Sequence, residues 1–371
     1  MKKILSKLPA SLPTRARGFT LIELLIGSAI MLVVVVGALS IYSRSNKISA
    51  DQQQHIEIQT DIRAAMYFVS RDVRMIGTGL TEPLAGYALD GVDNESTGTS
   101  ETPDRLKILG NIENPLALNI QSYSAPSVNV ALDDYSLENY PYPDSFYVGK
   151  VVLIVPNAGS SCVGMAVRTI THVTHNADGT NEKLNFSPGP APGINPPGGL
   201  SDICSVDDFI GGTITLCDLR EYWLDVTGNV TGLTAGANGY IGGGQGGVLY
   251  MTLNSVHYPI AQNVETIQFQ YNGDFDEDSE GLMDGFTNWN STWTRIQIGR
   301  IRQIRIQILG RTPNPFASVG HNTGTSAGLY GRPAVANTAA ATAPDWRKRF
   351  LLESTANIRN LSLNLFNTGL R

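Results

Sequence analysis

The residue of this chain with the clearest chemical role is Glu23, a carboxylate near the start of a long apolar run. It follows Gly18 and Phe19, and the segment before them is basic and contains no acid. A charge inside hydrocarbon costs about 2.5–3.5 kcal/mol at the centre of a membrane helix, and less near its end. A simple anchor gains nothing from this carboxylate. We therefore expect Glu23 to pair with a cation of another polypeptide when such helices pack together.

The segment Gly18-Phe19-Thr20-Leu21-Ile22-Glu23 resembles the processing motif of type IV pilins and type II secretion pseudopilins. The resemblance implies cleavage by a prepilin peptidase after Gly18, N-methylation of the new Phe19 amine, and assembly into a filament. It also implies that Glu23 neutralises the Phe19 amine of a neighbouring subunit. Both groups would be buried among apolar helices, where each is unfavourable unless it is paired.

A second candidate site is a run of alternating acidic residues whose carboxylates could converge on a calcium ion. The candidate ligands are Asp274, Asp276, Asp278 and Asp284. The run departs from an EF-hand loop at two positions, because Ser279 replaces the turn glycine and Gly285 replaces the bidentate glutamate. The alternative interpretation is a solvated acidic loop at the end of a strand. Calcium is the only cofactor that the sequence suggests.

Three cysteines are present: Cys162, Cys204 and Cys217. In an oxidising compartment they can form one disulfide, in three possible pairings. Cys204 and Cys217 are closest in sequence, and we predict that they pair. The alternative is that all three are small buried hydrophobic residues. The chain contains no CxxC motif, so a zinc site has no support.

The composition favours a loop-rich β structure over a helical enzyme, since the charged fraction is 16% and the chain has 38 glycines and 19 prolines. Loss of the five basic residues of the leader leaves 22 basic against 33 acidic residues, a net charge of −11. Such a protein is not expected to bind nucleic acid through its overall charge. No Cys/His pairing for nucleophilic catalysis stands out in the sequence, so we predict that the protein is not an enzyme.

Residues 1–18 are predicted to be a basic leader that is cleaved. Positive residues remain cytoplasmic, so the chain after Tyr42 is expected outside the inner membrane, in the periplasm. The alternative is an ordinary secretory signal peptide, with residues 1–40 removed. No small-residue cleavage site stands out after the apolar run, and helical periodicity continues past it.

Residues 19–76 are predicted to form one long helix, because no proline occurs between Pro13 and Pro83. Its membrane-spanning part is predicted at about residues 19–42. The 18 residues 24–41 would extend about 27 Å as a helix, close to the ~30 Å hydrocarbon core of a bilayer.

After the membrane segment the helix becomes amphipathic, and Gly77 and Gly79 are expected to end it. The apolar stripe contains Ile62, Ala65, Met66, Val69, Val73 and Ile76. Polar residues, among them Asp61, Arg63, Ser70, Arg71 and Arg74, are predicted to lie off this stripe. A head domain must cover the dry face of the helix.

Residues 77–371 are predicted to form an extracytoplasmic β-rich head domain. Strands are predicted at 105–109, 146–155, 164–173, 213–224, 247–253, 266–271, 302–309 and 350–361. Ile304, Ile306 and Ile308 alternate with Arg305 and Gln307, as in a strand with one solvated face. Antiparallel pairing is expected, because no helical patterns alternate with the strands. The predicted fold class is therefore α+β and pilin-like, with one long helix packed on a large antiparallel β head.

Three further stretches, 63–77, 263–271 and 346–360, resemble the PilW-type minor pilins. This resemblance implies a minor pilin of a type IV pilus that is anchored in the inner membrane, primes assembly and lies at or near the tip of the cell-surface fibre. The implied partners are other minor and major pilins, bound through the N-terminal helix, and the prepilin peptidase. Two alternatives remain: a J-type type II secretion pseudopilin, and a tip adhesin with a ligand-binding head.

Overall fold

The structure is a computed structural model of the chain. It describes residues 18–79, 84–93, 103–112, 117–123, 129–133, 137, 143–162, 165–178, 180–186, 204–225, 247–253, 256–276, 282–314, 330–337, 340 and 345–358. The chain divides into two compact units, residues 1–52 with 317–320 and residues 53–316 with 321–371. The second unit is called the head unit below.

Helix α1, Leu21–Arg74, begins two residues after the predicted start and ends two residues before the predicted end. Gly77 and Gly79 follow it with φ values of 73° and 81°. This left-handed conformation is one that glycine adopts without a steric penalty, and it stops the helix where the sequence indicates.

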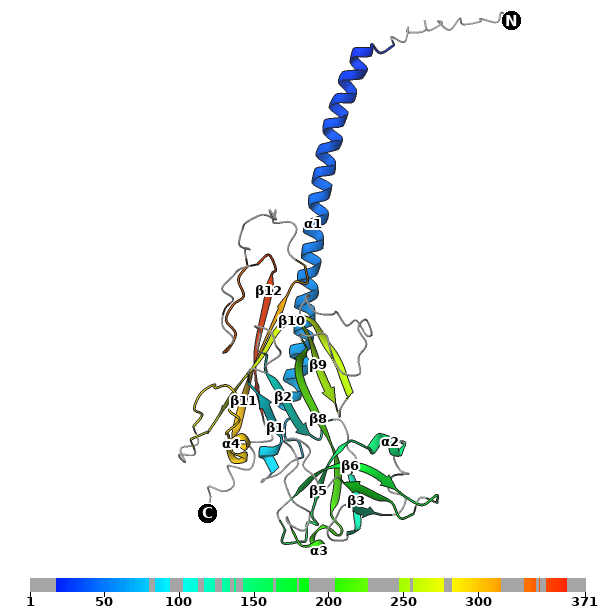
Figure 1. Cartoon of the computed structure of the whole chain (residues 1–371), viewed down its shortest axis with the longest axis vertical. Helices are drawn as coiled ribbons and strands as arrows, with labels where there is room; N and C mark the ends of the chain where they lie inside the picture. The colour runs from blue at the N-terminus through cyan, green and yellow to red at the C-terminus, as the bar shows by residue number, and fades with distance from the viewer. Residues whose placement is uncertain are drawn as a thin grey trace, which may run out of the picture. The chain divides into compact units, whose positions relative to one another are not determined.

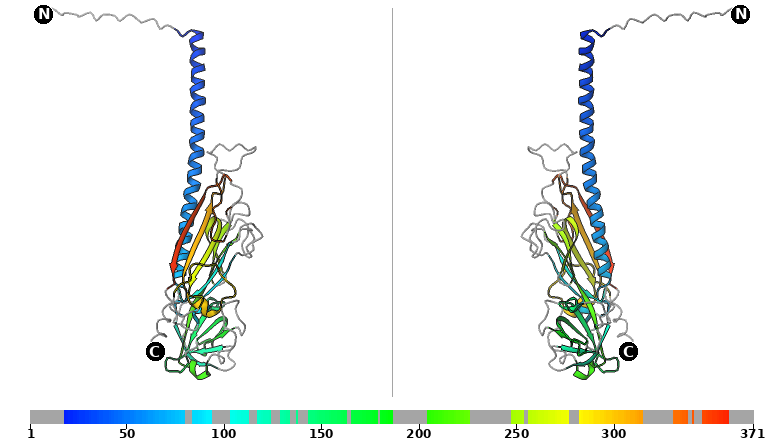
Figure 2. Two further views of the ribbon diagram at one scale, coloured as in Figure 1. Left: turned by 90° about the vertical axis from the view of Figure 1, so that its left-hand side faces the viewer. Right: turned by 90° about the vertical axis from the view of Figure 1, so that its right-hand side faces the viewer.

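The C-terminal half of α1 belongs to the head unit, and its apolar stripe is buried as predicted. Figure 2 shows this half of the helix lying along the sheet. The contact is close, because a Cβ on Gly310 would come within 2.8 Å of Ile58 and 2.9 Å of Ile62. Ser70 differs from the prediction: it is only 8% exposed, although it was expected off the stripe.

Seven antiparallel strands form the sheet that the helix covers, in the order β12-β11-β10-β9-β8-β2-β1 (Figure 1). Their bounds are β1 Leu89–Val92, β2 Arg105–Gly110, β8 Thr213–Asp225, β9 Gly247–Leu253, β10 Val256–Gly273, β11 Ile301–Arg311 and β12 Arg349–Asn357. The described residues thus form one long helix followed by an antiparallel β-rich head, which confirms the predicted α+β class.

Strand β11 shows how its two faces are used. Ile304, Ile306 and Ile308 are fully buried in the core shared with the helix, as their alternation predicts. The opposite face is more buried than predicted. Gln307 is only 9% exposed, and the Arg305 guanidinium lies 3.9 Å from the centre of the Phe286 ring. A segment after β10 therefore covers part of the face that the sequence pattern indicated as solvated.

The first half of β8 belongs to a closed barrel with five further strands, all antiparallel. These are β3 Ala117–Tyr123, β4 Asn129–Leu132, β5 Val151–Val155, β6 Ala166–Thr174 and β7 Lys183–Phe186. The pairings run β8-β3-β4-β7-β6-β5 and return to β8. The barrel has its own core, which includes Ile120, Ile154, Leu184 and Ile214. Because β8 continues from the barrel into the sheet, one strand ties the two parts of the head unit together.

Several strand predictions in this region were wrong. Residues 146–155 do not form one strand: Asp144–Tyr147 is a helical turn, α2, and the strand begins only at Val151. Four short strands, β1, β3, β4 and β7, were not predicted. Three of these four contain only four residues, and a pattern that short is difficult to detect in a sequence. Further short helices are η1 Leu84–Tyr87, α3 Val206–Phe209 and α4 Arg295–Gly299.

The disulfide prediction was also wrong, because the structure pairs Cys162 with Cys204, whose Cα atoms lie 5.8 Å apart. Cys217 is on β8 and its side chain is buried in the core beneath the helix. Burial raises the pKa of its thiol to about 12, so it stays protonated. Strand β8 thus carries Cys217 away from Cys204, although these two cysteines are the closest pair in the sequence.

A buried polar cluster joins the helix to the sheet. The carboxylate of Asp72, fully buried on α1, accepts hydrogen bonds from the guanidinium of Arg220 and the hydroxyl of Tyr222, both on β8. Arg71 donates to the same carboxylate at 2.9 Å. Burial, together with the nearby Asp72 charge, raises the pKa of the Tyr222 hydroxyl, so that it remains a donor.

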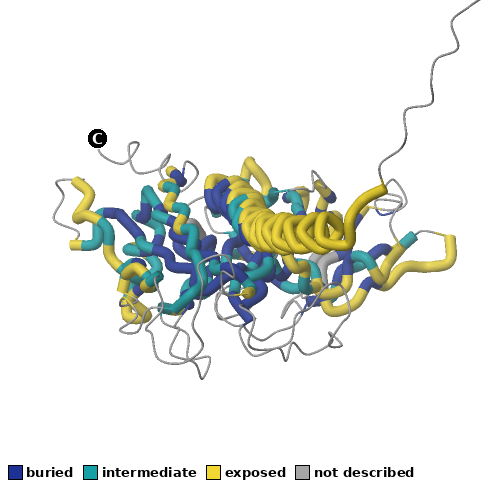
Figure 3. Tube along the Cα trace, turned by 90° about the horizontal axis from the view of Figure 1, so that it is seen from above, coloured by how far each residue is buried: buried dark blue, intermediate teal, exposed yellow. Residues whose placement is uncertain are grey.

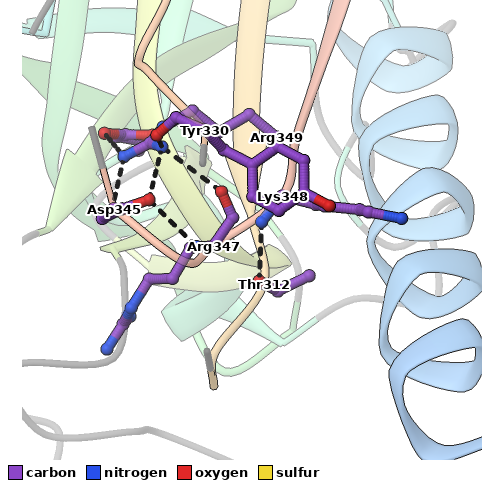
Figure 4. A network of polar contacts seen from close by, with 7 residues as sticks. Thr312, Tyr330, Asp345, Arg347, Lys348 and Arg349 are labelled. Carbon is purple, nitrogen blue, oxygen red and sulfur yellow. Dashed lines mark hydrogen bonds and ion pairs between the residues drawn. The ribbon is translucent and has the colours of Figure 1, made fainter. Parts of the chain in front are cut away.

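A second network fixes the start of β12 (Figure 4). The Arg349 guanidinium makes paired hydrogen bonds to Glu265, at 2.6 and 3.1 Å, and to Asp345, at 2.9 and 3.0 Å. Burial lowers the pKa of Arg349, but the hydrogen bonds to the two carboxylates outweigh this effect and raise it. The backbone N–H of Lys348 donates to the Thr312 hydroxyl at 3.1 Å. The basic run before the last strand therefore serves the fold.

Candidate processing and assembly site

The two residues of the predicted cleavage site are solvent-exposed. Phe19 is 86% exposed, and apart from the chain neighbours of Gly18 no described atom lies within 4 Å of the position that a Cβ of Gly18 would occupy. Helix α1 begins only at Leu21, so the Gly18–Phe19 bond lies outside the helix. A peptidase needs an accessible, non-helical bond, and this segment provides one. Cleavage at Gly18 and methylation at Phe19 remain predictions.

Glu23 forms a capping box with Thr20 at the start of α1. The Glu23 backbone N–H donates to the Thr20 hydroxyl oxygen at 3.3 Å, and the carboxylate oxygen Oε2 accepts from the Thr20 N–H and hydroxyl, both at 2.9 Å. Such boxes satisfy backbone donors that the first turn of a helix leaves unpaired. The sequence signal for this capping box is the spacing Thr20-x-x-Glu23, and the box was not predicted.

The capping box leaves part of the carboxylate available. Both hydrogen bonds from Thr20 reach Oε2, and within the described part of the chain no residue donates to Oε1. One oxygen can therefore serve the start of the helix while the other accepts from an ammonium group of another polypeptide. The cap is therefore compatible with the predicted pairing of Glu23, and mutation can separate the two.

The apolar run that follows is suited to a membrane. Its 18-residue window of highest hydropathy averages 2.7, and by length and composition α1 can cross a bilayer. Residues 21–50 are exposed on every side of the helix (Figure 3). An isolated helix of this kind requires an apolar environment, either lipid or the helices of other subunits. The segment fits an inner-membrane anchor.

The structure brings together three of the four predicted calcium ligands. Carboxylate oxygens of Asp274, Asp276 and Asp284 lie within 4.8 Å of one another, just after β10. Asp278 lies outside the described residues. Asp274 lies 3.4 Å from the Arg300 guanidinium, and Asp284 accepts from the Phe275 N–H at 2.6 Å. The arrangement suits a hard cation with oxygen ligands, and the calcium site remains a prediction.

Calcium is expected to raise the melting temperature of the intact protein, and EDTA to reverse the change. A ligand present at about 100 times its Kd stabilises the native state by about 2.7 kcal/mol. Asp276→Asn should remove the calcium effect, because it takes one negative charge from the site while keeping the size of this exposed side chain. Asp207→Asn, an exposed carboxylate on α3, should keep it. Equal melting temperatures in calcium and EDTA would contradict the prediction.

Comparison with known proteins confirms the N-terminal resemblance. Residues 13–39 match the family model described as the prokaryotic N-terminal methylation motif. This match includes Gly18, Phe19 and Glu23, and it supports the type IV pilin-like class. It does not reach the head unit, so the PilW-type resemblance remains a prediction.

No curated protein matches the chain. A solved structure, the type IV-like pilin TTHA1219 from Thermus thermophilus, is similar over 58% of this chain and 90% of its own, with 14% sequence identity and a TM-score of 0.19. These values are too low to transfer any detail of the head.

Proposed function

We propose that this chain is a minor subunit of a type IV pilus. A prepilin peptidase removes residues 1–18, and the Phe19 amine is methylated. The apolar segment then holds the protein in the inner membrane, with the head unit in the periplasm, until the subunit joins other pilins. The methylation motif, continuous with a membrane-length apolar helix, is the observation that carries this proposal.

The size of the head supports a priming role at or near the tip. The head unit combines a seven-stranded sheet with a closed six-stranded barrel. In a regular fibre every subunit has neighbours on all sides, and a large head limits how closely they pack. A subunit at the end of the fibre has fewer neighbours, so a bulky head is tolerated there. The proposed role is structural, and no catalytic step is assigned to this protein.

Mass spectrometry of protein from cells and from sheared filaments tests the processing step. The expected first residue is Phe19, carrying one added methyl group. Gly18→Trp should abolish leader removal and give a more slowly migrating band. Gly27→Ala is the matched control, because this glycine lies within the helix with open space around it. Filament protein that retains Met1, or that begins well after Tyr42, would contradict the proposal.

Deletion of the gene tests the priming role. Fewer surface pili are expected, with normal levels of the major subunit in the membrane, because initiation rather than synthesis would be affected. Normal piliation with defective protein secretion would instead favour a secretion pseudopilin.

A further inference from the structure

A basic groove lies in the head unit between the last turns of α1 and strand β12. Its volume is about 770 Å³, within the range of about 300–1,000 Å³ that is usual for ligand sites. Its lining includes Arg63, Arg71 and Arg74 of the helix and Ser354 of β12, and the described lining contains no acid. The helix and β12 lie side by side in both views of Figure 2. The groove therefore presents a concentrated positive charge on an otherwise acidic protein.

Two of the three guanidinium groups are held in place by neighbours. Arg71 donates to buried Asp72 and lies 5.7 Å from the centre of the Phe68 ring, yet its side chain remains 42% exposed. Arg63 lies 5.7 Å from the centre of the Phe350 ring at the start of β12. Positioned guanidinium groups lose little conformational entropy when they bind a carboxylate.

Arg74 is the cation best placed to accept a new partner. It is exposed, and its side chain forms no ion pair with any residue in the described part of the chain. It lies one turn after Ser70, so the two side chains share one side of the helix. Both residues line the groove, so one ligand can contact Ser70 and Arg74 together.

Ser70 provides independent evidence for a ligand. It is only 8% exposed, it lines the groove, and its hydroxyl has no hydrogen-bond partner among the residues that the structure describes. A buried hydroxyl without a partner is unfavourable, and most buried polar atoms in proteins are paired. A hydroxyl at the base of an arginine-lined groove is a suitable donor to a carboxylate oxygen.

We propose that this groove binds an acidic, extended polypeptide segment of another protein. Carboxylates of the segment would bind Arg71 and Arg74, and one carboxylate oxygen would accept a hydrogen bond from the Ser70 hydroxyl. Tyr67, which is 66% exposed on the same lining, offers an apolar contact to a side chain between two acids. The site would recognise acidic residues spaced along a strand.

The position of β12 favours a polypeptide over a phospholipid headgroup or a free anion. Strand β12 ends the sheet and pairs only with β11 among the described strands. On its other edge the described residues provide no strand partner, and extended peptides commonly bind such edges by adding a strand. Neither a small anion nor a headgroup would use this edge. The inference does not require that the chain enters a filament.

A direct binding measurement tests the inference. The probe is a fluorescent peptide of alternating glutamate and valine, titrated into the intact protein in nonionic detergent and followed by anisotropy. The same peptide with glutamine in place of glutamate should not bind. Binding to the glutamate peptide should weaken as salt increases, because exposed charges are screened.

Variants locate the binding. Arg74→Glu is expected to weaken the peptide at least about tenfold, since an attraction becomes a repulsion. Ser70→Ala is expected to weaken it about tenfold, through loss of one hydrogen bond to a charged acceptor, without lowering the melting temperature. Lys183→Glu is the matched control: it makes the same charge change on β7 of the barrel and should bind as the wild type does.

Three results would overturn the inference. Equal affinity of wild type, Arg74→Glu and Ser70→Ala would place binding elsewhere. Displacement of the peptide by inorganic phosphate at similar concentration would identify a small-anion site. Displacement by micelles containing phosphatidylglycerol, but not by nonionic micelles, would identify a lipid-headgroup site.

Discussion

Replacing Glu23 with leucine is expected to leave membrane insertion intact and to reduce incorporation into filaments at least about tenfold. Leucine is favourable in a membrane helix, whereas a carboxylate is not, so insertion loses nothing. In the assembled bundle, however, the methylated amine of a neighbour would remain buried without its counter-charge. Removing one partner of a buried ion pair costs about 3–5 kcal/mol.

The capping box makes it necessary to separate two roles of Glu23. Glu23→Gln keeps an oxygen that can accept from Thr20 but removes the charge. Thr20→Ala keeps the charge but removes the cap, at a cost of about 0.5–2 kcal/mol to the helix. If charge pairing drives assembly, Glu23→Gln should be nearly as defective as Glu23→Leu, and Thr20→Ala should be mild.

The measurement is the ratio of each variant in sheared filaments to that in the membrane, by immunoblot. Incorporation of Glu23→Gln at the wild-type level, with a severe defect in Thr20→Ala, would show that the carboxylate acts only at the start of the helix. Equal incorporation of Glu23→Leu and wild type would refute any role for Glu23 in assembly.

Replacing Asp72 with alanine is expected to lower the free energy of unfolding of the head unit by about 3–5 kcal/mol. Arg220 is 1% exposed, and the change would remove the Asp72 carboxylate from beside its buried charge. The hydroxyl of Tyr222 would lose its acceptor in the same step. A native domain is stable by only about 5–15 kcal/mol, so the loss is a large fraction of the total.

A double variant tests whether the loss of stability comes from removing the Asp72 carboxylate from beside the buried Arg220 charge. Asp72→Leu combined with Arg220→Met replaces the ion pair with apolar side chains, and such replacements are often neutral or stabilising. We expect the double variant to recover most of the stability that Asp72→Ala loses. Recovery would show that apolar packing alone can hold the helix on the sheet.

Urea unfolding, followed by the fluorescence of the four tryptophans, measures these effects on the intact protein in detergent. Asp207→Ala is the control, since an exposed carboxylate should change stability by no more than about 0.5 kcal/mol. A fragment used for the same purpose should begin near residue 53, because Ile58 and Ile62 belong to the core of the head unit. A loss below about 1 kcal/mol for Asp72→Ala would contradict the prediction.

The N-terminal segment could be understood from sequence because its information is local. The order of Gly18, Phe19 and Glu23, followed by an apolar run, lies within 25 consecutive residues and matches a known motif. The helix and its buried stripe follow from a periodicity of 3.6 residues, which also needs no knowledge of distant segments. The long strand β11 was predictable for the same reason, through its alternating isoleucines.

Other features depend on which distant segments meet, and only the tertiary structure decided them. Closure of the barrel requires β5 and β3 to flank the same half of β8. This closure carries Cys217 into the core and leaves Cys204 beside Cys162. Asp72 and Ser70 look like ordinary polar residues of an exposed helix face. Asp72 is buried where Arg220 and Tyr222, 148 and 150 positions away, supply its hydrogen-bond donors. Ser70 is buried in a groove that it lines together with Ser354 of β12. Burial and pairing depend on the contacts that folding creates, and a local sequence pattern does not show which distant residues make those contacts.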